Sequence, residues 1–282
     1  MYFIPFIGAF SLATIALMEK LVLRVRKLSI EKMQVYSFFA SVIVMLPIIY
    51  FFWNIKSGAF DSKNILIFIL IIIFSVIANL LSFYSLKGKE LTNIEPARML
   101  EPLFVVVLAI IFSFFSLLYD RNLNIIIPAL IAVSALILSN TKRHHLHLDK
   151  YILAAIGGSF FFAVELILSR LILEFYSPIS FYFLRNLAVL FLSFIIFKPK
   201  LKGTSSKIKR EIFFIGFLWV VYRLAVYYGY IHVGVITTTL ILLLAPVIIY
   251  FFAWKFLKEK PNWKNIISAI IILGCVFYVV VW

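Results

Sequence analysis

Charged side chains inside long apolar segments are the residues of this sequence with the clearest chemical potential. Arg98 and Glu101 stand three residues apart in the apolar segment 93–116, and Glu95 precedes Arg98 by three. Residues at this spacing share one broad helix face, where opposite charges can pair. An ionisable group deep in a bilayer costs roughly 2.5–3.5 kcal/mol, so it usually faces a partner or a water-filled cavity. We expect Arg98 and Glu101 to contact a charged ligand there, and Glu101 also to carry a coupling ion.

A second group of residues shares one face of the segment 211–231. Its members follow one another at spacings of four, four and three, and they are Trp219, Arg223, Tyr227 and Tyr230. On a helix they fall within about 80° of one another. An arginine among aromatic rings suits an anionic or aromatic ligand. Aromatic stripes on membrane helices also serve as packing or interface belts, which is the alternative interpretation.

Four further polar residues complete the predicted ligand site. Glu165 has no charged neighbour within one helical turn, so it must find a partner on another helix or take up a proton, and we predict it as a second coupling-ion residue. Arg185 either contacts the ligand or extends its charge to the membrane surface. Aligning Pro102 with Pro246 makes Asn79 the counterpart of Arg223, and Thr238, or its neighbour Thr239, either contacts ligand or bonds its own helix. For every charged residue the alternative is a structural ion pair between helices.

The sequence predicts no metal site, no cofactor and no catalytic residue. His144, His145 and His147 lie in a basic segment without acidic or cysteine companions, and Cys275 is the single cysteine. Phosphate-binding loops, nucleophile elbows and zinc-helix motifs are also missing from the sequence. We therefore predict that the protein is not an enzyme.

The composition shows what must position these residues. Of the 282 residues, 64% are hydrophobic and only 14% are charged, and the mean hydropathy is +1.09. A water-soluble surface cannot be built from this balance, so lipid is the expected solvent. The net charge of +15 does not indicate nucleic acid, because the basic residues lie in short breaks between apolar runs.

Runs of about 20 apolar residues, the length that crosses a bilayer, occur ten times. The predicted spans are 3–23, 34–53, 64–86, 93–116, 122–140, 151–173, 178–197, 211–231, 235–257 and 263–281. The fold class is therefore an all-α, polytopic membrane protein with short connections. Strands are excluded because the runs are too long and do not alternate.

Basic residues favour one side of this arrangement. The connections 24–33, 87–92, 141–150, 198–210 and 255–264 hold nearly all of the loop Lys and Arg residues, whereas the other side has only Lys56, Lys63 and Arg121. The positive-inside rule places the first set in the cytoplasm and both termini outside.

The two halves of the chain are similar, which predicts one membrane domain built from two five-helix repeats, 1–143 and 144–282. Glu101-Pro102 matches Ala245-Pro246, and Ile7-Gly8 matches Ile156-Gly157. Five is an odd number, so the second repeat must enter the membrane inverted. Inverted repeats place a ligand site at their interface near mid-membrane and permit alternating access.

These motifs resemble the drug/metabolite transporter superfamily and, within it, the EamA-like transporters. The resemblance rests on Tyr84-Ser85-Leu86, on the segment from Ile94 to Phe104 with its Leu-Glu-Pro-Leu-Phe core, and on Leu240 to Pro246 followed by Lys258-Glu259-Lys260. It implies a basket of ten helices that moves metabolites. It also implies cytoplasmic termini, which is opposite to what the charge distribution predicts. The acidic residue that the family usually has after its fourth helix would here be Asp120.

Two functions follow as hypotheses. The first is a secondary transporter of a small polar or zwitterionic, amino-acid-like metabolite in the cytoplasmic membrane, because the deep charges of both signs nearly balance. The second is a flippase or carrier of a lipid-linked or anionic amphipathic substrate, with Arg223 on its phosphate. A membrane-embedded enzyme is third, without a recognised catalytic cluster. The expected partners are the small-molecule substrate and the lipid bilayer, and the internal duplication allows a monomer or a homodimer.

Overall fold

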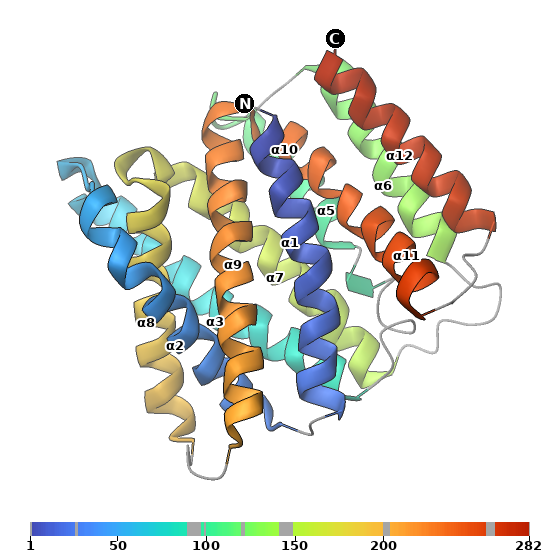
Figure 1. Cartoon of the computed structure of the whole chain (residues 1–282). Coiled ribbons are helices and arrows are strands. Elements are labelled where there is room, and N and C mark those ends of the chain that lie inside the picture. The colour runs from blue at the N-terminus through green and yellow to red at the C-terminus, as the bar shows by residue number, and fades with distance from the viewer. Residues whose placement is uncertain are drawn as a thin grey trace.

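The computed structural model describes residues 2–25, 28–88, 97–98, 100–119, 122–140, 149–199, 204–257 and 263–281, and these ranges are mainly helical (Figure 1). In the first half the helices are α1 (Phe3–Lys20), η1 (Leu21–Val25), α2 (Ile30–Phe52), η2 (Ser57–Phe60), α3 (Ser62–Gly88), α5 (Leu100–Ser113) and α6 (Leu123–Asn140). In the second half they are α7 (Lys150–Ile172), η3 (Leu173–Phe175), α8 (Pro178–Phe197), α9 (Ser206–His232), α10 (Val235–Leu242), α11 (Leu244–Leu257) and α12 (Trp263–Val281).

Seven helical segments among the described residues are long and apolar enough to cross a membrane. They are Phe3–Leu23, Ile30–Phe52, Ser62–Gly88, Lys150–Phe175, Pro178–Phe197, Ser206–His232 and Trp263–Val281. Shorter apolar helices, Leu100–Ser113, Leu123–Ser139 and Val235–Ile249, lie where three further spans are predicted. The all-helical membrane fold is thereby confirmed, whereas the number of ten spans and the inverted repeat remain predictions.

Helix starts follow local capping rather than the ends of apolar runs. The Ser29 hydroxyl accepts from the Lys32 backbone N–H, and the Ser205 hydroxyl accepts from that of Ile208. These N-caps satisfy backbone donors that the first turn leaves free. As a result, α2 begins four residues and α9 five residues before the predicted spans, across charged sequence that hydropathy excludes.

The predicted span 235–257 is helical, with an interruption of one residue at Leu243 between α10 and α11. Pro246 explains the break: it has no N–H to bond the carbonyl of Leu242 four residues earlier. The Leu243 N–H instead contacts the carbonyls of Thr239 and Leu240. The interruption lies beside a cavity described below.

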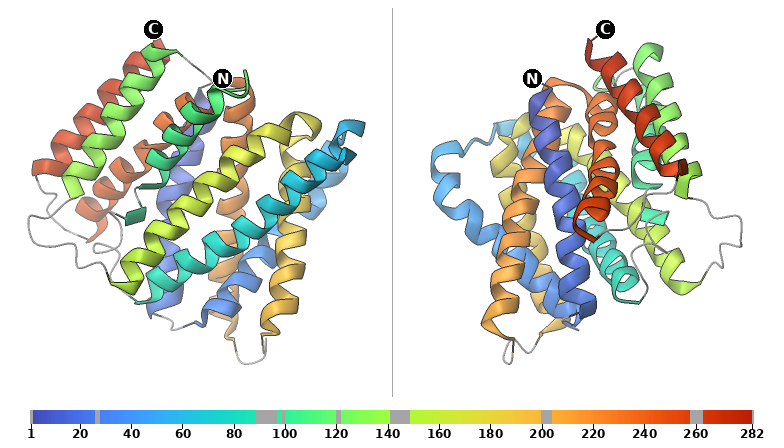
Figure 2. Two further views of the ribbon diagram at one scale, coloured as in Figure 1. Left: turned by 180° about the vertical axis from the view of Figure 1, so that it is seen from behind. Right: turned by 45° about the vertical axis from the view of Figure 1, so that its right-hand side comes forward.

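Helices of the first half pair with helices of the second. The closest pairs are α1 with α9, α2 with α8 and with α9, α3 with α7, and α6 with α12. Both views in Figure 2 show α6 and α12 side by side, next to the larger bundle. The center of this bundle is therefore lined by both halves of the chain.

The outward surface is apolar, as a lipid environment requires. Phe115 is 84% exposed and Phe51 is 77% exposed, and many other Phe, Ile and Leu side chains point outward. Charged residues are instead found buried inside, including Glu19, Glu165, Arg185 and Arg223. This inside-out distribution of polarity is expected of a membrane protein and costly for one in water.

Candidate substrate site

A buried cluster of one acid and two bases lies between α7, α8 and α9. Glu165 is fully buried, and Arg185 and Arg223 are each 2% exposed. Glu165 Oε1 lies 3.2 Å from Arg185 Nε, and Glu165 Oε2 lies 3.2 Å from Arg223 Nη1. Each carboxylate oxygen thus faces its own arginine, and the partners predicted to lie on other helices are found.

Hydroxyl groups complete this cluster. The Tyr227 hydroxyl donates to Glu165 Oε1 at 3.4 Å, and the Ser169 hydroxyl lies 3.2 Å from the same oxygen. Arg185 Nη2 donates to the Ser75 hydroxyl of α3 at 2.6 Å, and its Nη1 reaches the Tyr227 hydroxyl at 3.5 Å. Buried charges need such partners, because an unpaired polar group in an apolar interior is expensive.

Aromatic rings surround the guanidinium group of Arg223. Its Cζ lies 5.6 Å from the ring centers of Phe162 and Trp219 and 5.7 Å from that of Tyr222. Ring faces attract a cation through their quadrupole, especially where water is excluded. Arg223 therefore does lie among aromatic rings, and these rings are packing contacts of its guanidinium group.

The larger of two cavities, about 100 Å³ in volume, is lined by helices of both halves. Arg98 and Glu101 are partly buried on its wall, together with Tyr222, Tyr230 and Thr239. The charges of Arg223 and Arg98 both act on Glu101. The remaining lining is apolar: Leu12, Ala16, Pro102, Val105, Leu136, Leu166, Leu242, Leu243, Ala245, Pro246 and Ile249.

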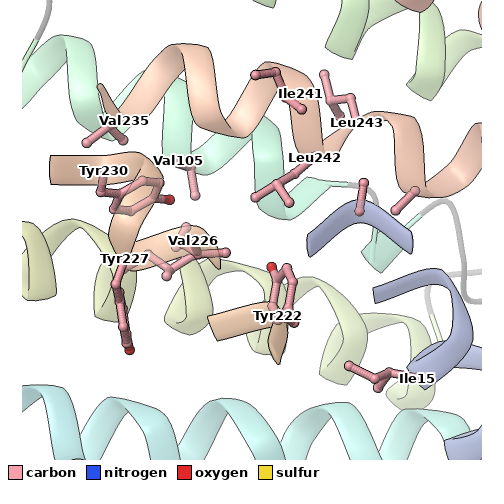
Figure 3. Close-up of a cluster of buried hydrophobic side chains, with 14 of the residues drawn as sticks. Ile15, Val105, Tyr222, Val226, Tyr227, Tyr230, Val235, Ile241, Leu242 and Leu243 are labelled. Carbon is pink, nitrogen blue, oxygen red and sulfur yellow. The ribbon is translucent and has the colours of Figure 1, made fainter. Parts of the chain in front are cut away.

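Figure 3 shows how the tyrosines of α9 divide. Tyr222 points toward Leu242, and Tyr230 lies beside Val105 and Val235, whereas Tyr227 points away from them. This division fits the cavity lining, in which Tyr222 and Tyr230 take part and Tyr227 does not.

The smaller cavity has a volume of about 20 Å³, and most of its lining residues carry a polar group. It is lined by Ser37, Phe38, Ser41, Asn79, Phe83, Tyr182, Arg185, Trp219 and Arg223, from α2, α3, α8 and α9. Tyr222 lines the larger cavity and the next residue, Arg223, lines the smaller one, so the two cavities lie on different faces of α9 at the same height along the helix.

The predicted site residues are therefore shared between two cavities and the cluster that joins them. Arg98, Glu101 and Tyr230 line the larger cavity; Asn79, Arg185, Trp219 and Arg223 line the smaller one. Glu165 and Tyr227 line neither and belong to the ion-pair cluster. Thr238 also lies apart, because it packs against Gly229 while the next residue, Thr239, reaches the larger cavity.

Sequence reasoning missed Glu19, which is 1% exposed in α1. Its carboxylate accepts a hydrogen bond of 2.8 Å from the indole N–H of Trp219, and the charge of Arg98 acts on it. An acidic residue inside the apolar run 3–23 was the available signal. Glu19 thereby links α1 to α9 and to Arg98 on the cavity wall.

No group of three or more His, Cys, Asp or Glu side chains arranged for a metal ion occurs within the described ranges. The predicted positions Glu95, His144, His145 and His147 lie outside those ranges. The polar groups of the two cavities are arginines, carboxylates, hydroxyls and amides, which suit an organic ion with both charge signs.

Comparison with known proteins now identifies the second half of the chain. Residues 149–281 match the sequence model of the EamA-like transporter family, within the drug/metabolite transporter superfamily. These residues form an EamA-like transporter domain. The EamA-like domain contributes α7 to α12, and with them Glu165, Arg185 and Arg223.

Solved structures share the fold around the EamA-like domain. Matches are found with 25 chains of known structure. One crystal structure aligns over 99% of this chain and 96% of its own, with a TM-score of 0.75 and 16% sequence identity. At this identity the likeness establishes the arrangement of helices and nothing about the substrate. No curated protein matches the chain.

Proposed function

We propose that the protein is a secondary transporter of a small polar or zwitterionic metabolite of amino-acid type in the cytoplasmic membrane. The observation that carries the proposal is the pair of opposite charges, Arg98 and Glu101, on the wall of one cavity inside an apolar helical bundle. A zwitterion offers an ammonium group to the glutamate, and its carboxylate needs an arginine nearby. The EamA-like domain supports the broader assignment to membrane transporters.

The position of the cavity supports alternating access. Helices of both halves line it, and two of its wall residues are prolines within helices, Pro102 in α5 and Pro246 in α11. Sites at the interface of two inverted repeats can open to either side when one repeat moves against the other. One copy of the chain suffices for this movement, whether the protein is a monomer or a homodimer.

Glu101 and Glu165 differ in how each could take part in ion coupling. Glu101 borders the cavity, so a proton can reach it with the solute. Glu165 touches neither cavity and is paired with Arg185 and Arg223. In the proposed mechanism Glu101 exchanges the coupling proton, and Glu165 responds through Arg223, whose charge also acts on Glu101.

Transport in proteoliposomes tests the proposal. The purified protein is reconstituted, and uptake of a panel of radiolabelled amino acids and polar metabolites is measured with and without a proton gradient, against protein-free liposomes. We expect uptake of at least one zwitterionic solute, stimulated by the gradient. Failure to move any member of the panel under either condition would refute the transporter.

The second candidate is a flippase or carrier of a lipid-linked or anionic amphipathic substrate. The mainly apolar lining of the larger cavity favours it, because an acyl chain needs such a wall. Fluorescently labelled phospholipid in the same liposomes tests this function. Movement of the labelled lipid between leaflets without solute uptake would replace the first candidate with the second.

A further inference from the structure

The smaller cavity contains a buried hydrogen-bonding group with no partner. Ser37 of α2 is 6% exposed and lines this cavity, and its hydroxyl has no hydrogen-bond partner among the described residues. Its neighbour Ser41 differs, because the Ser41 hydroxyl donates to the Ser37 carbonyl at 3.0 Å. A buried hydroxyl without a partner costs free energy, so its retention beside a cavity points to a ligand atom.

The charges around the smaller cavity also leave room for an anion. Arg185 and Arg223 both line it, and the cluster sets one carboxylate, Glu165, against these two guanidinium groups. Each guanidinium has five N–H donors in a planar fork. Of the other buried acids, Glu101 borders the larger cavity, and Glu19 bonds Trp219 and faces the charge of Arg98. Within the described ranges Glu165 is therefore the one acid paired with both arginines of the smaller cavity, and a solute carboxylate there would face two guanidinium groups.

The volume of the smaller cavity limits what can enter. About 20 Å³ holds little more than one water-sized group, for which roughly 10–15 Å³ is needed. A carboxylate, with two oxygen atoms, therefore enters only if the cavity widens, and a tetrahedral phosphate, with four, would need still more room. Tyr222 of the larger cavity and Arg223 of the smaller one are successive residues of α9, so a solute held by Arg223 would extend past α9 to place its other groups in the larger cavity.

We propose that the smaller cavity is the subsite for the carboxylate of the transported solute, bound by Arg185 and Arg223 with Ser37 as hydroxyl donor. This inference rests on the proposed function and adds the orientation of the substrate. The carboxylate lies between α2, α8 and α9, and the ammonium group and side chain lie toward Glu101. Glu165 remains the resident counter-ion of both arginines.

Binding of sodium propionate to the detergent-purified protein tests the subsite. The melting temperature is followed as propionate is added, with propionamide as the uncharged control of the same shape and sodium chloride at equal ionic strength. We expect stabilisation by propionate alone. Equal shifts with propionamide or chloride, or stabilisation by sodium phosphate without any by propionate, would overturn the assignment to a carboxylate.

Substitutions at Ser37 locate the binding. Ser37→Asp places a tethered carboxylate beside the two arginines, so it should raise the melting temperature and abolish the propionate response, whereas the uncharged Ser37→Asn should not raise it. If Ser37→Asp does not fold, Ser37→Ala tests the same contact, because it removes the hydroxyl. We expect it to lower propionate affinity by about tenfold. A propionate response unchanged by both Ser37→Asp and Ser37→Ala would place the anion elsewhere.

Transport separates this inference from the function on which it rests. A Ser37→Asp protein should lose uptake of the zwitterion that the wild type moves. Propionate binding that depends on Ser37, in a protein that moves no solute, would keep the subsite and refute the transporter. Normal uptake by Ser37→Asp would keep the transporter and refute the subsite.

Discussion

At the scale of single residues, Glu101 carries the sharpest test because it is an acid on the cavity wall. Glu101→Gln keeps the size of the side chain and removes its charge. A hydrogen bond to a charged group contributes about 1.5–3 kcal/mol, which is roughly a ten- to hundredfold effect. We expect zwitterion uptake in proteoliposomes to fall by that factor or more, toward background, while the melting temperature in detergent stays near that of the wild type.

Glu174→Gln is the matched control for this substitution. Glu174 is exposed in η3 and lines neither cavity, so uptake should be unaffected. Equal uptake by the Glu101→Gln and wild-type proteins would remove Glu101 from both ligand binding and ion coupling. A large loss of melting temperature in Glu101→Gln would instead assign the residue to helix packing.

Glu165 is expected to behave in the opposite way, with an effect on stability. Glu165→Gln leaves Arg185 and Arg223 buried without their counter-ion. Removing one partner of a buried ion pair costs about 3–5 kcal/mol. Thermal unfolding in detergent should therefore show a marked loss of melting temperature, with Glu174→Gln again near wild type. A Glu165→Gln protein as stable as the control would mean that the pairs contribute little.

Sequence identified these residues through the cost of burying charge, but it could not identify their partners. Arg223 among aromatic rings and a distant partner for Glu165 follow from residue type and spacing alone. That Glu165 pairs with Arg223 depends on how α7 and α9 are rotated against each other, which one helix does not encode. Rotation also decided between Thr238 and Thr239, which the sequence left open as alternatives: Thr239 lines the larger cavity and Thr238 does not.

At the scale of helices, the close contact of α2 and α9 depends on Gly216. A Cβ at this position would lie 2.6 Å from Ala40 Cβ and 3.0 Å from the Ser41 backbone nitrogen. Gly216→Ala must therefore push α2 away, and overpacking of this kind costs about 1–3 kcal/mol. We expect a lower melting temperature and, because Ser37 and Ser41 of α2 line the smaller cavity, weaker propionate binding.

Gly274 of α12 provides the matched control. A Cβ there would meet nothing within 4 Å, so Gly274→Ala adds no clash, and alanine favours the helix by up to about 1 kcal/mol. Its melting temperature should equal or exceed that of the wild type. Equal melting temperatures for the two variants would show that α2 and α9 separate without cost.

Helix boundaries were predictable where hydropathy and capping agree. The predicted spans 178–197 and 263–281 coincide with α8 and α12. Where they disagree, the backbone hydrogen bonds set the helix boundary. Ser205 caps the start of α9 before the apolar run begins, and Pro246 interrupts the backbone hydrogen bonds after α10 inside the apolar run 235–257. Hydropathy reports burial in lipid, whereas capping and proline determine the backbone hydrogen bonds.

At the scale of the whole molecule, the packing of helices follows a pattern of exchange between halves. Five-helix repeats would make α1 equivalent to α7, α3 to α9, and α5 to α10 with α11. If each helix is replaced by its equivalent in the other half, the pair α1 and α9 becomes the pair α7 and α3. The pair α5 and α7 likewise becomes the pair α11 and α1. All four of these pairs are in contact. A two-fold relation between inverted halves would produce this pattern, and it supports the proposed repeat.

The orientation of the molecule in its membrane is where charge and family resemblance disagree. N and C lie at one end in Figure 1, and the start of α9 lies at the other. Many basic residues of the described ranges lie at helix ends that, by the predicted spans, share a side with the start of α9. They include Lys32, Lys87, Lys150, Lys198, Lys207, Lys209, Arg210 and Lys264. Lys56 and Lys63 flank η2, in the connection between α2 and α3. The charge distribution therefore predicts external termini, and the resemblance predicts internal ones.

Cysteine labelling of intact cells decides between these orientations. Ser57 of η2 and Ser206 of α9 are both exposed, and the predicted spans put their two connections on opposite sides of the membrane. Each is changed to cysteine in a Cys275→Ser background, which removes the single native thiol. If the positive charges face the cytoplasm, a membrane-impermeant maleimide should label Ser57→Cys and should label Ser206→Cys only after lysis. The reverse result would give the protein cytoplasmic termini, and the basic ends of its helices would then have been translocated against the positive-inside rule.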